Sequence, residues 1–150
     1  MPNIKKRGQS SVEFLMIVAV ATALLLPATF FFFSYAQGTT SQIASAQINN
    51  AGNAIKIGAE EMFGIGPNSW KTIEIRMPDT FIEAGIKNNS ELYFTYNTQF
   101  GISQSVHFFD RFQIRTHEDC YNNCSLENLT RGVNRIRLES KGSYVEILVR

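Results

Sequence analysis

The fold is decided by a short basic segment that runs into a long apolar one: Lys5-Lys6-Arg7-Gly8-Gln9-Ser10-Ser11-Val12-Glu13-Phe14, followed by an apolar run to Phe33. A helix of about 20 residues is about 30 Å long, which matches the hydrocarbon thickness of a bilayer. The apolar run therefore predicts a membrane-spanning helix.

The charges that flank this run predict its orientation. Lys5, Lys6 and Arg7 precede it, and no lysine or arginine follows until Lys56. Because positively charged flanks are retained in the cytoplasm, we expect the N-terminus inside and the chain from Ser34 onward outside. Most of the chain is thus expected to be exported.

The apolar run differs from an ordinary secretory signal, which has an apolar core of about 7–15 residues and a small-residue cleavage site. Here the core is longer, and it ends in four consecutive phenylalanines at residues 30–33. Glu13 lies at the start of the run, where a carboxylate is costly to place in lipid. A simple anchor gains nothing from this charge, so we expect Glu13 to have a partner.

Arg7-Gly8 followed by Gln9-x-Ser11-x-Glu13-Phe14 resembles the class III signal peptide of archaeal type IV pilin-like proteins. In that family a prepilin peptidase cuts after the glycine, and the hydrophobic helix stays in the mature protein. The resemblance covers the leader and the apolar helix. It implies cleavage between Gly8 and Gln9, and polymerisation with identical or related subunits into a filament on the archaeal cell surface. Bacterial tight-adherence pilus proteins have a similar Glu-Phe opening.

The chemistry of Glu13 agrees with this resemblance. Cleavage would create a positive amine on Gln9, and in a helical bundle with little water that amine and the Glu13 carboxylate of a neighbouring subunit would each supply the partner the other lacks. Such a pair would set the axial register of the subunits. The alternative is that Glu13 lies in the cytoplasmic headgroup layer and offsets Lys5 and Arg7.

Length and composition leave room for this anchor and one small domain. The chain has 150 residues, 44% of them hydrophobic, and a formal net charge of +1. Loss of residues 1–8 would remove three positive charges and leave the mature chain net negative. No basic patch remains, so nucleic acid is not a predicted partner.

The chain after the apolar run is expected to continue as a helix. Residues 34–55 contain no charged side chain, and apolar or small residues recur at spacings of three to five, which is typical of an amphipathic helix. These residues are Ile43, Ile48, Ala51, Ile55, Gly58 and Met62. A helix over residues 9–63 would end at the stop signal Gly64-Ile65-Gly66-Pro67. A low-complexity linker over 34–55 is the alternative.

Beyond Ser69 the apolar period changes to two, which predicts strands. We expect them at residues 71–77, 81–87, 92–97, 104–115, 133–139 and 144–149. In the fourth, Val106, Phe108, Phe112 and Ile114 share one face, and Asp110 marks a bulge or break. The predicted fold is α+β: a leader at 1–8, a helix at 9–63, and an extracellular domain at 64–150 built on an antiparallel sheet of about six strands.

Two cysteines, Cys120 and Cys124, lie in a polar loop on the exported side, where a short-loop disulfide is expected. The alternative is a metal site of His117, Cys120 and Cys124, with His107 as a fourth ligand. That spacing lacks the second ligand pair of a zinc site, so we predict no metal and no cofactor.

Three glycosylation motifs lie in turn-like sequence of the same domain, at Asn88, Asn123 and Asn128. All three would be on the outer side of the membrane. We therefore expect these asparagines to carry glycans.

Catalytic signatures are missing from the sequence: it has no nucleophile elbow, no phosphate-binding glycine loop and no histidine-rich cluster. The sequence predicts a non-enzymatic structural subunit, held in the membrane before assembly and in a surface filament afterwards. The alternative is a non-polymerising, single-pass anchor for an extracellular binding domain. The uncharged helix from Phe14 to Ile55 favours the filament, since a solitary stalk in water would gain solubility from charge.

Overall fold

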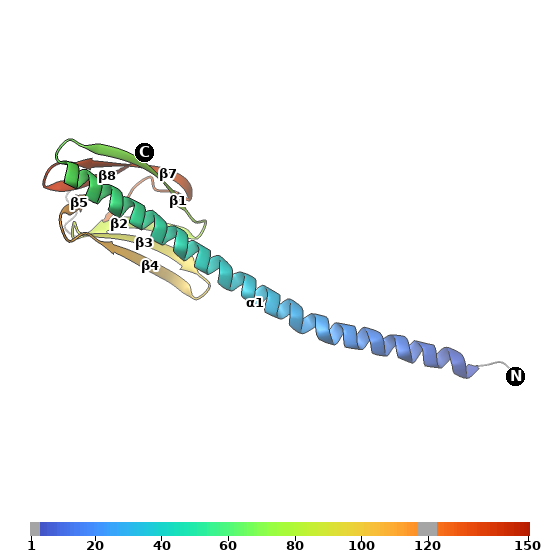
Figure 1. The fold of residues 1–150 in the computed structure, drawn as a ribbon. Coiled ribbons are helices and arrows are strands. Elements are labelled where there is room, and N and C mark those ends of the chain that lie inside the picture. Colours follow the sequence, from blue (N-terminus) through green and yellow to red (C-terminus); the bar gives the residue numbers. More distant parts are fainter. Residues whose placement is uncertain (1–3, 117–122) are drawn as a thin grey trace. The chain divides into compact units, whose positions relative to one another are not determined.

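A computed structural model describes residues 4–116 and 123–150, which form one helix and eight strands (Figure 1). The chain divides into two compact units, an N-terminal unit (Met1–Thr40) and a head unit (Ser41–Arg150), and the helix runs through both. The elements are α1 (Ile4–Ile65), β1 (Trp70–Met77), β2 (Phe81–Lys87), β3 (Glu91–Thr98), β4 (Gly101–Phe108), β5 (Gln113–Arg115), β6 (Asn123–Ser125), β7 (Gly132–Ser140) and β8 (Tyr144–Val149).

Helix α1 contains the whole of the predicted helix and extends beyond it at both ends. Residues 34–55 are helical, so the helix prediction is confirmed there and the linker alternative is wrong. The helix ends where the glycines predicted: Gly66 has φ +113°, and its amide donates to the carbonyl of Met62 at 3.2 Å. A left-handed glycine that satisfies an orphan carbonyl is a common helix stop.

The strands form two four-stranded sheets, in the orders β1-β7-β8-β5 and β4-β3-β2-β6. The α+β class is confirmed, but the expectation of one antiparallel sheet with about six strands is wrong. The strand expected over 104–115 is two strands, and β5 pairs with β8 in parallel. The break lies at Asp110, as the sequence suggested. Phe109 and Phe112 on either side of it are 4% and 8% exposed, so the link between the two sheets is anchored in the core.

The turn between β2 and β3 lies at the turn-like sequence that begins at Asn88. Asn88 and Asn89 both have positive φ, at 53° and 54°. Asparagine tolerates this region better than other side chains, and two such residues in succession form a tight hairpin turn that matches the twist of the strands. The Asn89 carbonyl also accepts a hydrogen bond from the Ile114 amide at 2.8 Å, which links this turn to β5.

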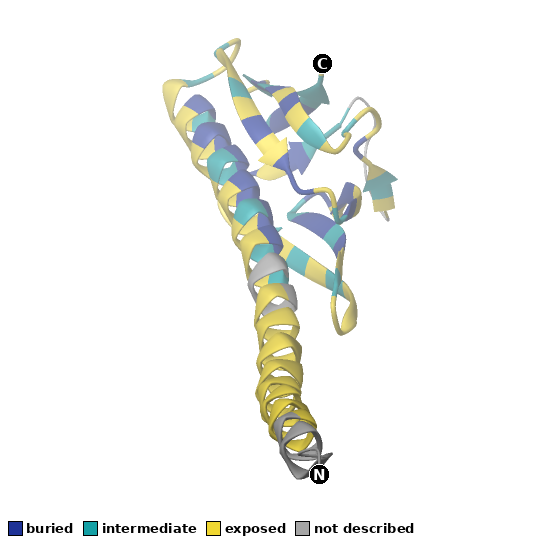
Figure 2. Ribbon diagram, turned by 90° about the vertical axis from the view of Figure 1, so that its right-hand side faces the viewer, coloured by how far each residue is buried: buried dark blue, intermediate teal, exposed yellow. Residues whose placement is uncertain are grey.

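The last third of α1 forms part of the core of the head unit. One side of the helix is buried there (dark blue in Figure 2). Its side chains join those of both sheets in one apolar cluster. The buried apolar side chains of the helix are those of Ala44, Ile48, Ala51, Ile55, Ala59 and Met62, and Gly52 and Gly58 are buried beside them. Most of the predicted stripe is thus buried, but Ile43 is 54% exposed. The head unit begins at Ser41, whereas the sequence divided the chain at Gly64.

Candidate functional site

The N-terminal unit exposes its apolar side chains. Its helix has the length and composition to cross a membrane, with a mean hydropathy of 2.4 over its most apolar window, and none of that window is buried. The phenylalanines at 30–33 are each 65–70% exposed. A contiguous apolar surface of this size marks a contact with lipid or with other protein chains.

Glu13 lies at one end of an apolar stripe on this helix. It lines a shallow surface groove with Met16, Ile17, Val20, Ala21 and Leu24. These positions follow Glu13 at spacings of three, four, seven, eight and eleven residues, which lie on one face of a helix. The exposed Glu13 carboxylate therefore lies on the same face of α1 as apolar side chains, which favour surroundings without water.

The predicted cleavage site also lies in α1. Gly8 and Gln9 are helical, and their side chains lie outside the described residues. Gln9 precedes Glu13 by four residues, about one turn, so the two positions are on the same side of the helix.

A second exposed helix face lies in the head unit, on the side of α1 away from the core. Ile43, Asn50 and Ile57 follow one another at intervals of seven residues, and all three are exposed. Ile43 and Ile57 are 54% and 65% exposed. Residues seven apart form a narrow seam along a helix, and such a seam is suited to packing against a second helix.

The β3–β4 hairpin lies alongside α1. Ser105 Oγ donates to Asn49 Oδ1 at 2.7 Å, and the Gln99 amide in the hairpin turn donates to Ser41 Oγ at 3.3 Å. Gln99, in the turn, thus contacts a residue nearer the N-terminus of α1 than Ser105 does. The turn therefore lies beside Ser41, where the head unit begins.

The turn of this hairpin presents two apolar side chains to the surface. Phe100 is 91% exposed and Ile102 is 73% exposed. Thr98 Oγ1 closes the turn, because it donates to the Gly101 carbonyl at 2.8 Å and accepts from the Phe100 amide at 3.3 Å. Gly101 has φ +120°, which disfavours other residues there. The sequence analysis did not single out Phe100, although an aromatic residue in a polar turn is a visible signal.

Strand β4 is an edge of its sheet and carries no formal charge. Charged side chains and short length protect exposed edges from pairing with other strands. The other three edge strands are β1, β5 and β6. Strand β1 is as long as β4 but carries Lys71, Glu74 and Arg76. Strands β5 and β6 have only three residues each. Within residues 4–116 and 123–150, β4 is therefore the long sheet edge that charge does not protect.

His107 packs against Gly52 of α1, a contact that the sequence did not reveal. A Cβ at position 52 would overlap the imidazole ring. Burial lowers the pKa of His107 below its usual value, and the positive charge of Lys56 lowers it further. Its Nε2 lies 3.4 Å from Ser105 Oγ, and its ring meets Phe94 edge-on. The neutral imidazole serves as a packing group between β4 and the helix.

The cysteine site is described only in part. Cys124 is disulfide-bonded. Cys120 and His117 lie outside the described residues, so the Cys120–Cys124 pairing and the metal alternative both stay predictions. In the part of the chain that the structure describes, no three histidine, cysteine or acidic side chains are grouped to hold a metal ion.

The three predicted glycosylation sites are all exposed: Asn88, Asn123 and Asn128. Asn123 pairs with Lys87 across β2 and β6, so it lies next to the Asn88 turn at the same end of the sheet. That end of β3 is opposite to the Phe100 turn. The exposure of these side chains is compatible with modification.

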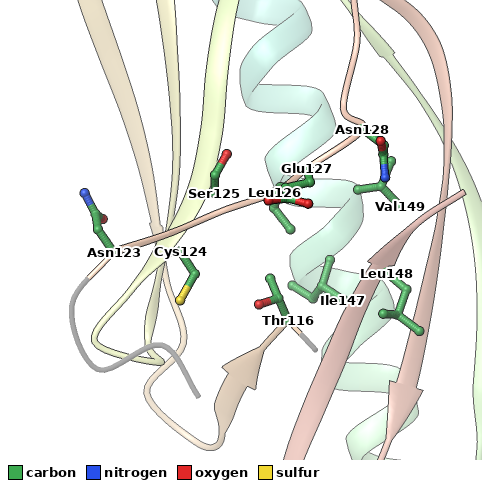
Figure 3. Close-up of a pocket in the computed structure, with 10 residues that line it drawn as sticks. All are labelled: Thr116, Asn123, Cys124, Ser125, Leu126, Glu127, Asn128, Ile147, Leu148 and Val149. Atoms are coloured by element: carbon green, nitrogen blue, oxygen red, sulfur yellow. The ribbon is translucent and has the colours of Figure 1, made fainter. Parts of the chain in front are cut away.

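A pocket of about 490 Å³ opens beside β6 and β8, where Asn123, Cys124 and Asn128 line it together with Leu126 and Ile147 (Figure 3). Two further lining residues are Thr116 and Glu127. Thr116 and Asn123 flank residues 117–122, so part of the surroundings of this pocket lies outside the described residues. Its mixed polar and apolar lining does not define a ligand class.

In comparisons with protein-family models, curated proteins and solved structures, the chain has no significant match.

Proposed function

We propose that the chain is the structural subunit of a type IV pilus-like surface filament. It is made as a membrane-inserted precursor, cut after Gly8 by a prepilin peptidase, and polymerised through α1. The observation that carries this proposal is the exposed apolar surface of the N-terminal unit with Glu13 at one end of its stripe. The head unit is the part displayed on the outside of the filament.

An apolar helix surface can move from lipid into a helical bundle, because both surroundings are apolar and neither exposes it to water. The small and polar side chains that follow the apolar run also support packing of α1 in a helical bundle. Residues 34–55 are helical and uncharged, and uncharged surfaces let helices approach one another without desolvating ions. In the head unit, Ile43, Asn50 and Ile57 form a second exposed seam on α1 that can take part in helix contacts.

Glu13 has a specific role in the proposed assembly. In a bundle that excludes water, its carboxylate needs a positive partner, and cleavage supplies one on Gln9 of a neighbouring subunit. A mispaired subunit would leave two buried charges without partners. The pair therefore selects one axial position among the many that apolar contacts alone would allow.

The test is to express Glu13→Ala beside the parent and compare the yield of sheared filaments by electron microscopy with membrane-retained monomer by immunoblot. We expect export, cleavage and folding of the head unit to be unchanged and the filament yield to fall to background. Glu60→Ala is the matched control, since Glu60 is also an exposed glutamate on α1 but lies in the head unit. It should assemble like the parent.

Equal filament yields from Glu13→Ala and the parent would exclude the registration role, because a pair exposed in the headgroup layer is worth only ~0–1 kcal/mol. Absence of filaments from both proteins, with the monomer present in the membrane, would favour a solitary anchor with an extracellular binding domain.

A further inference from the structure

We propose that strand β4 of the head unit pairs in an antiparallel sense with β4 of a second copy of this chain. The four-stranded sheet that contains β4 then continues without a break from one copy into the other. The contact is isologous, since both copies use the same edge, and it closes in a dimer. It does not depend on polymerisation through α1, which needs a heterologous contact that repeats.

The free side of β4 offers backbone groups to a partner. Within the described residues, β4 pairs with β3 alone. The amide of Phe109, directly after β4, donates to the Ser90 carbonyl at 2.8 Å, on the side of β3. Because bonded and non-bonded positions alternate along an antiparallel pair, every second residue of β4 points its N–H and C=O to the free side. These residues are Ile102, Gln104, Val106 and Phe108.

The same four residues have their side chains on the face of the sheet away from α1. Ser105 and His107, which lie between them in the strand, contact α1. Successive side chains of a strand point to opposite faces, so the four edge residues point outward. All four are exposed, Ile102 and Phe108 by 73% and 53%. A partner strand would therefore meet exposed side chains and free backbone groups on the same residues.

The direction of the backbone groups determines the register of the pair. The two residues of a bonded pair must both point toward the partner strand. The register that uses all four edge residues of both copies pairs Ile102 with Phe108. It also pairs Gln104 with Val106 and places Ser105 opposite its own counterpart on the two-fold axis. A shift by one residue breaks every bonded pair, and a shift by two leaves Ile102 or Phe108 outside the contact.

The match of β4 with itself identifies a second copy as the occupant of this edge. In this register an aliphatic side chain, Ile102, lies beside the aromatic ring of Phe108 at both ends of the contact, and such cross-strand pairs stabilise sheets. The strand carries no formal charge, so no like charges meet across the axis. Charged residues are a common protection of sheet edges against this kind of pairing, and β4 lacks that protection.

The dimer is expected to depend on protein concentration. Two paired strands of eight residues bury less surface than stable complexes, which bury about 1,200–2,000 Å². A covalent trap detects such a weak contact and also reports its register.

The test uses the full chain in detergent with single cysteine substitutions in β4. Ser105→Cys puts a thiol on the two-fold axis, where the Cα atoms of a non-bonded pair are about 4.5 Å apart and a disulfide can form. Ser103→Cys is the matched control, because Ser103 is also a half-buried serine on the same face of β4. Its counterpart would lie four residues along the partner strand, about 14 Å away.

The proteins are oxidised mildly at rising concentration, and covalent dimers are measured by gel electrophoresis without reductant. We expect at least ~10-fold more dimer from Ser105→Cys than from Ser103→Cys, because cysteines whose Cα atoms are more than ~7 Å apart cannot be bridged. The parent measures any dimer that its own two cysteines form.

Two further variants separate the backbone contact from effects of the cysteine itself. Gln104→Pro, added to Ser105→Cys, removes an N–H on the free side, a position where edge strands tolerate proline. The dimer yield should then fall to that of Ser103→Cys. A mixture of Gln104→Cys and Val106→Cys chains leaves the contact of Ser105 with α1 unchanged. It should give mixed dimers, and each of the two chains alone should give few.

Equal dimer yields from Ser105→Cys and Ser103→Cys would overturn the inference, and so would the absence of mixed dimers from the Gln104→Cys and Val106→Cys chains. An undiminished yield with Gln104→Pro would overturn it too, because the free backbone groups would then have no part in the contact. Recovery of Ser105→Cys from its native membrane linked to a different protein, and not to itself, would assign the edge to another partner. None of these outcomes concerns Glu13 or the filament yield, so the proposed function would stand.

Discussion

The imidazole of His107 occupies the space beside Gly52 that any larger residue would need. The absence of a side chain at Gly52 brings β4 directly against α1. Gly58 has a similar relation to Leu138 of β7, so the helix approaches both sheets closely through its glycines. The close packing of α1 against the two sheets of the head unit therefore depends on two glycines, Gly52 and Gly58.

Substitution of Gly52 by alanine should destabilise the head unit. The new methyl would overlap the imidazole, and overpacking of this kind costs about 1–3 kcal/mol, which exceeds the gain of at most ~1 kcal/mol from alanine's helix propensity. The free energy of unfolding of the detergent-solubilised chain, measured by denaturant titration, should fall accordingly.

Gly64→Ala provides the control, because the Cβ that it would add meets no atom within 4 Å apart from the adjacent residues and the nearby backbone of its own helix. This variant should be as stable as the parent or slightly more stable. If Gly52→Ala and Gly64→Ala unfold at the same denaturant concentration, the contact between Gly52 and His107 is not tight in solution.

The head unit should lose stability in mild acid through His107. Because burial and Lys56 keep its pKa below the usual value, the unfolded chain takes up the proton first as the pH falls. The stability that the neutral His107 side chain contributes is fully present above the pKa of the unfolded chain, about 6.5. It is lost as the pH falls through the lower pKa of the folded chain. Denaturation midpoints of the parent should therefore decrease between about pH 8 and about pH 5.

His107→Gln isolates this contribution, because glutamine does not titrate. The variant is expected to be less stable than the parent at the upper end of the range but to show a shallower decrease toward acid. Identical pH profiles for the two proteins would mean that other groups control the acid response.

The mature protein should begin at Gln9. The motif around Gly8 predicts the cut, and the helix that follows it would remain intact in the product. Mass spectrometry of the protein from its native membrane should find a chain that lacks residues 1–8. Recovery of only uncut chains, with Met1 or Pro2 at the N-terminus, would contradict the assignment of the leader.

Cys120 and Cys124 should be oxidised to one another in the exported protein. Alkylation without a reductant should then leave both thiols unlabelled, and alkylation after reduction should label both. Labelling of both thiols in freshly isolated, unreduced protein would refute the disulfide. Stoichiometric zinc in the purified protein would point instead to the metal alternative with His117.

Local signals predicted the individual elements well. The strands at 81–87 and 144–149 have the expected bounds, and the helix stop at Gly66 and the Asn88-Asn89 turn follow from φ preferences that those residues carry in any protein. The apolar run and Glu13 were also evident, because a helix that exposes apolar side chains on all sides has a continuous apolar sequence.

The division into two sheets could not be predicted, because it depends on contacts between distant residues. Val106, Phe108, Phe112 and Ile114 were expected to share one face, but the first two are exposed and the last two are buried. Alternation fixes which residues share a side within a strand, whereas the sheet that a strand joins is decided by tertiary packing. The contact of Gly52 with His107 was hidden for the same reason.

The burial of α1 in the head unit determines which truncated proteins can fold. A fragment that starts at Gly64 would lose Ile48, Ile55 and Met62 from its core, each of which is at most 4% exposed in the intact head. At ~1.5–3 kcal/mol for each side chain, the loss is comparable to the whole stability of a typical domain, about 5–15 kcal/mol. A fragment for crystallisation must therefore keep the helix from Ser41 onward, and it then exposes Ile43 and Ile57 to water but omits the apolar run of the N-terminal unit.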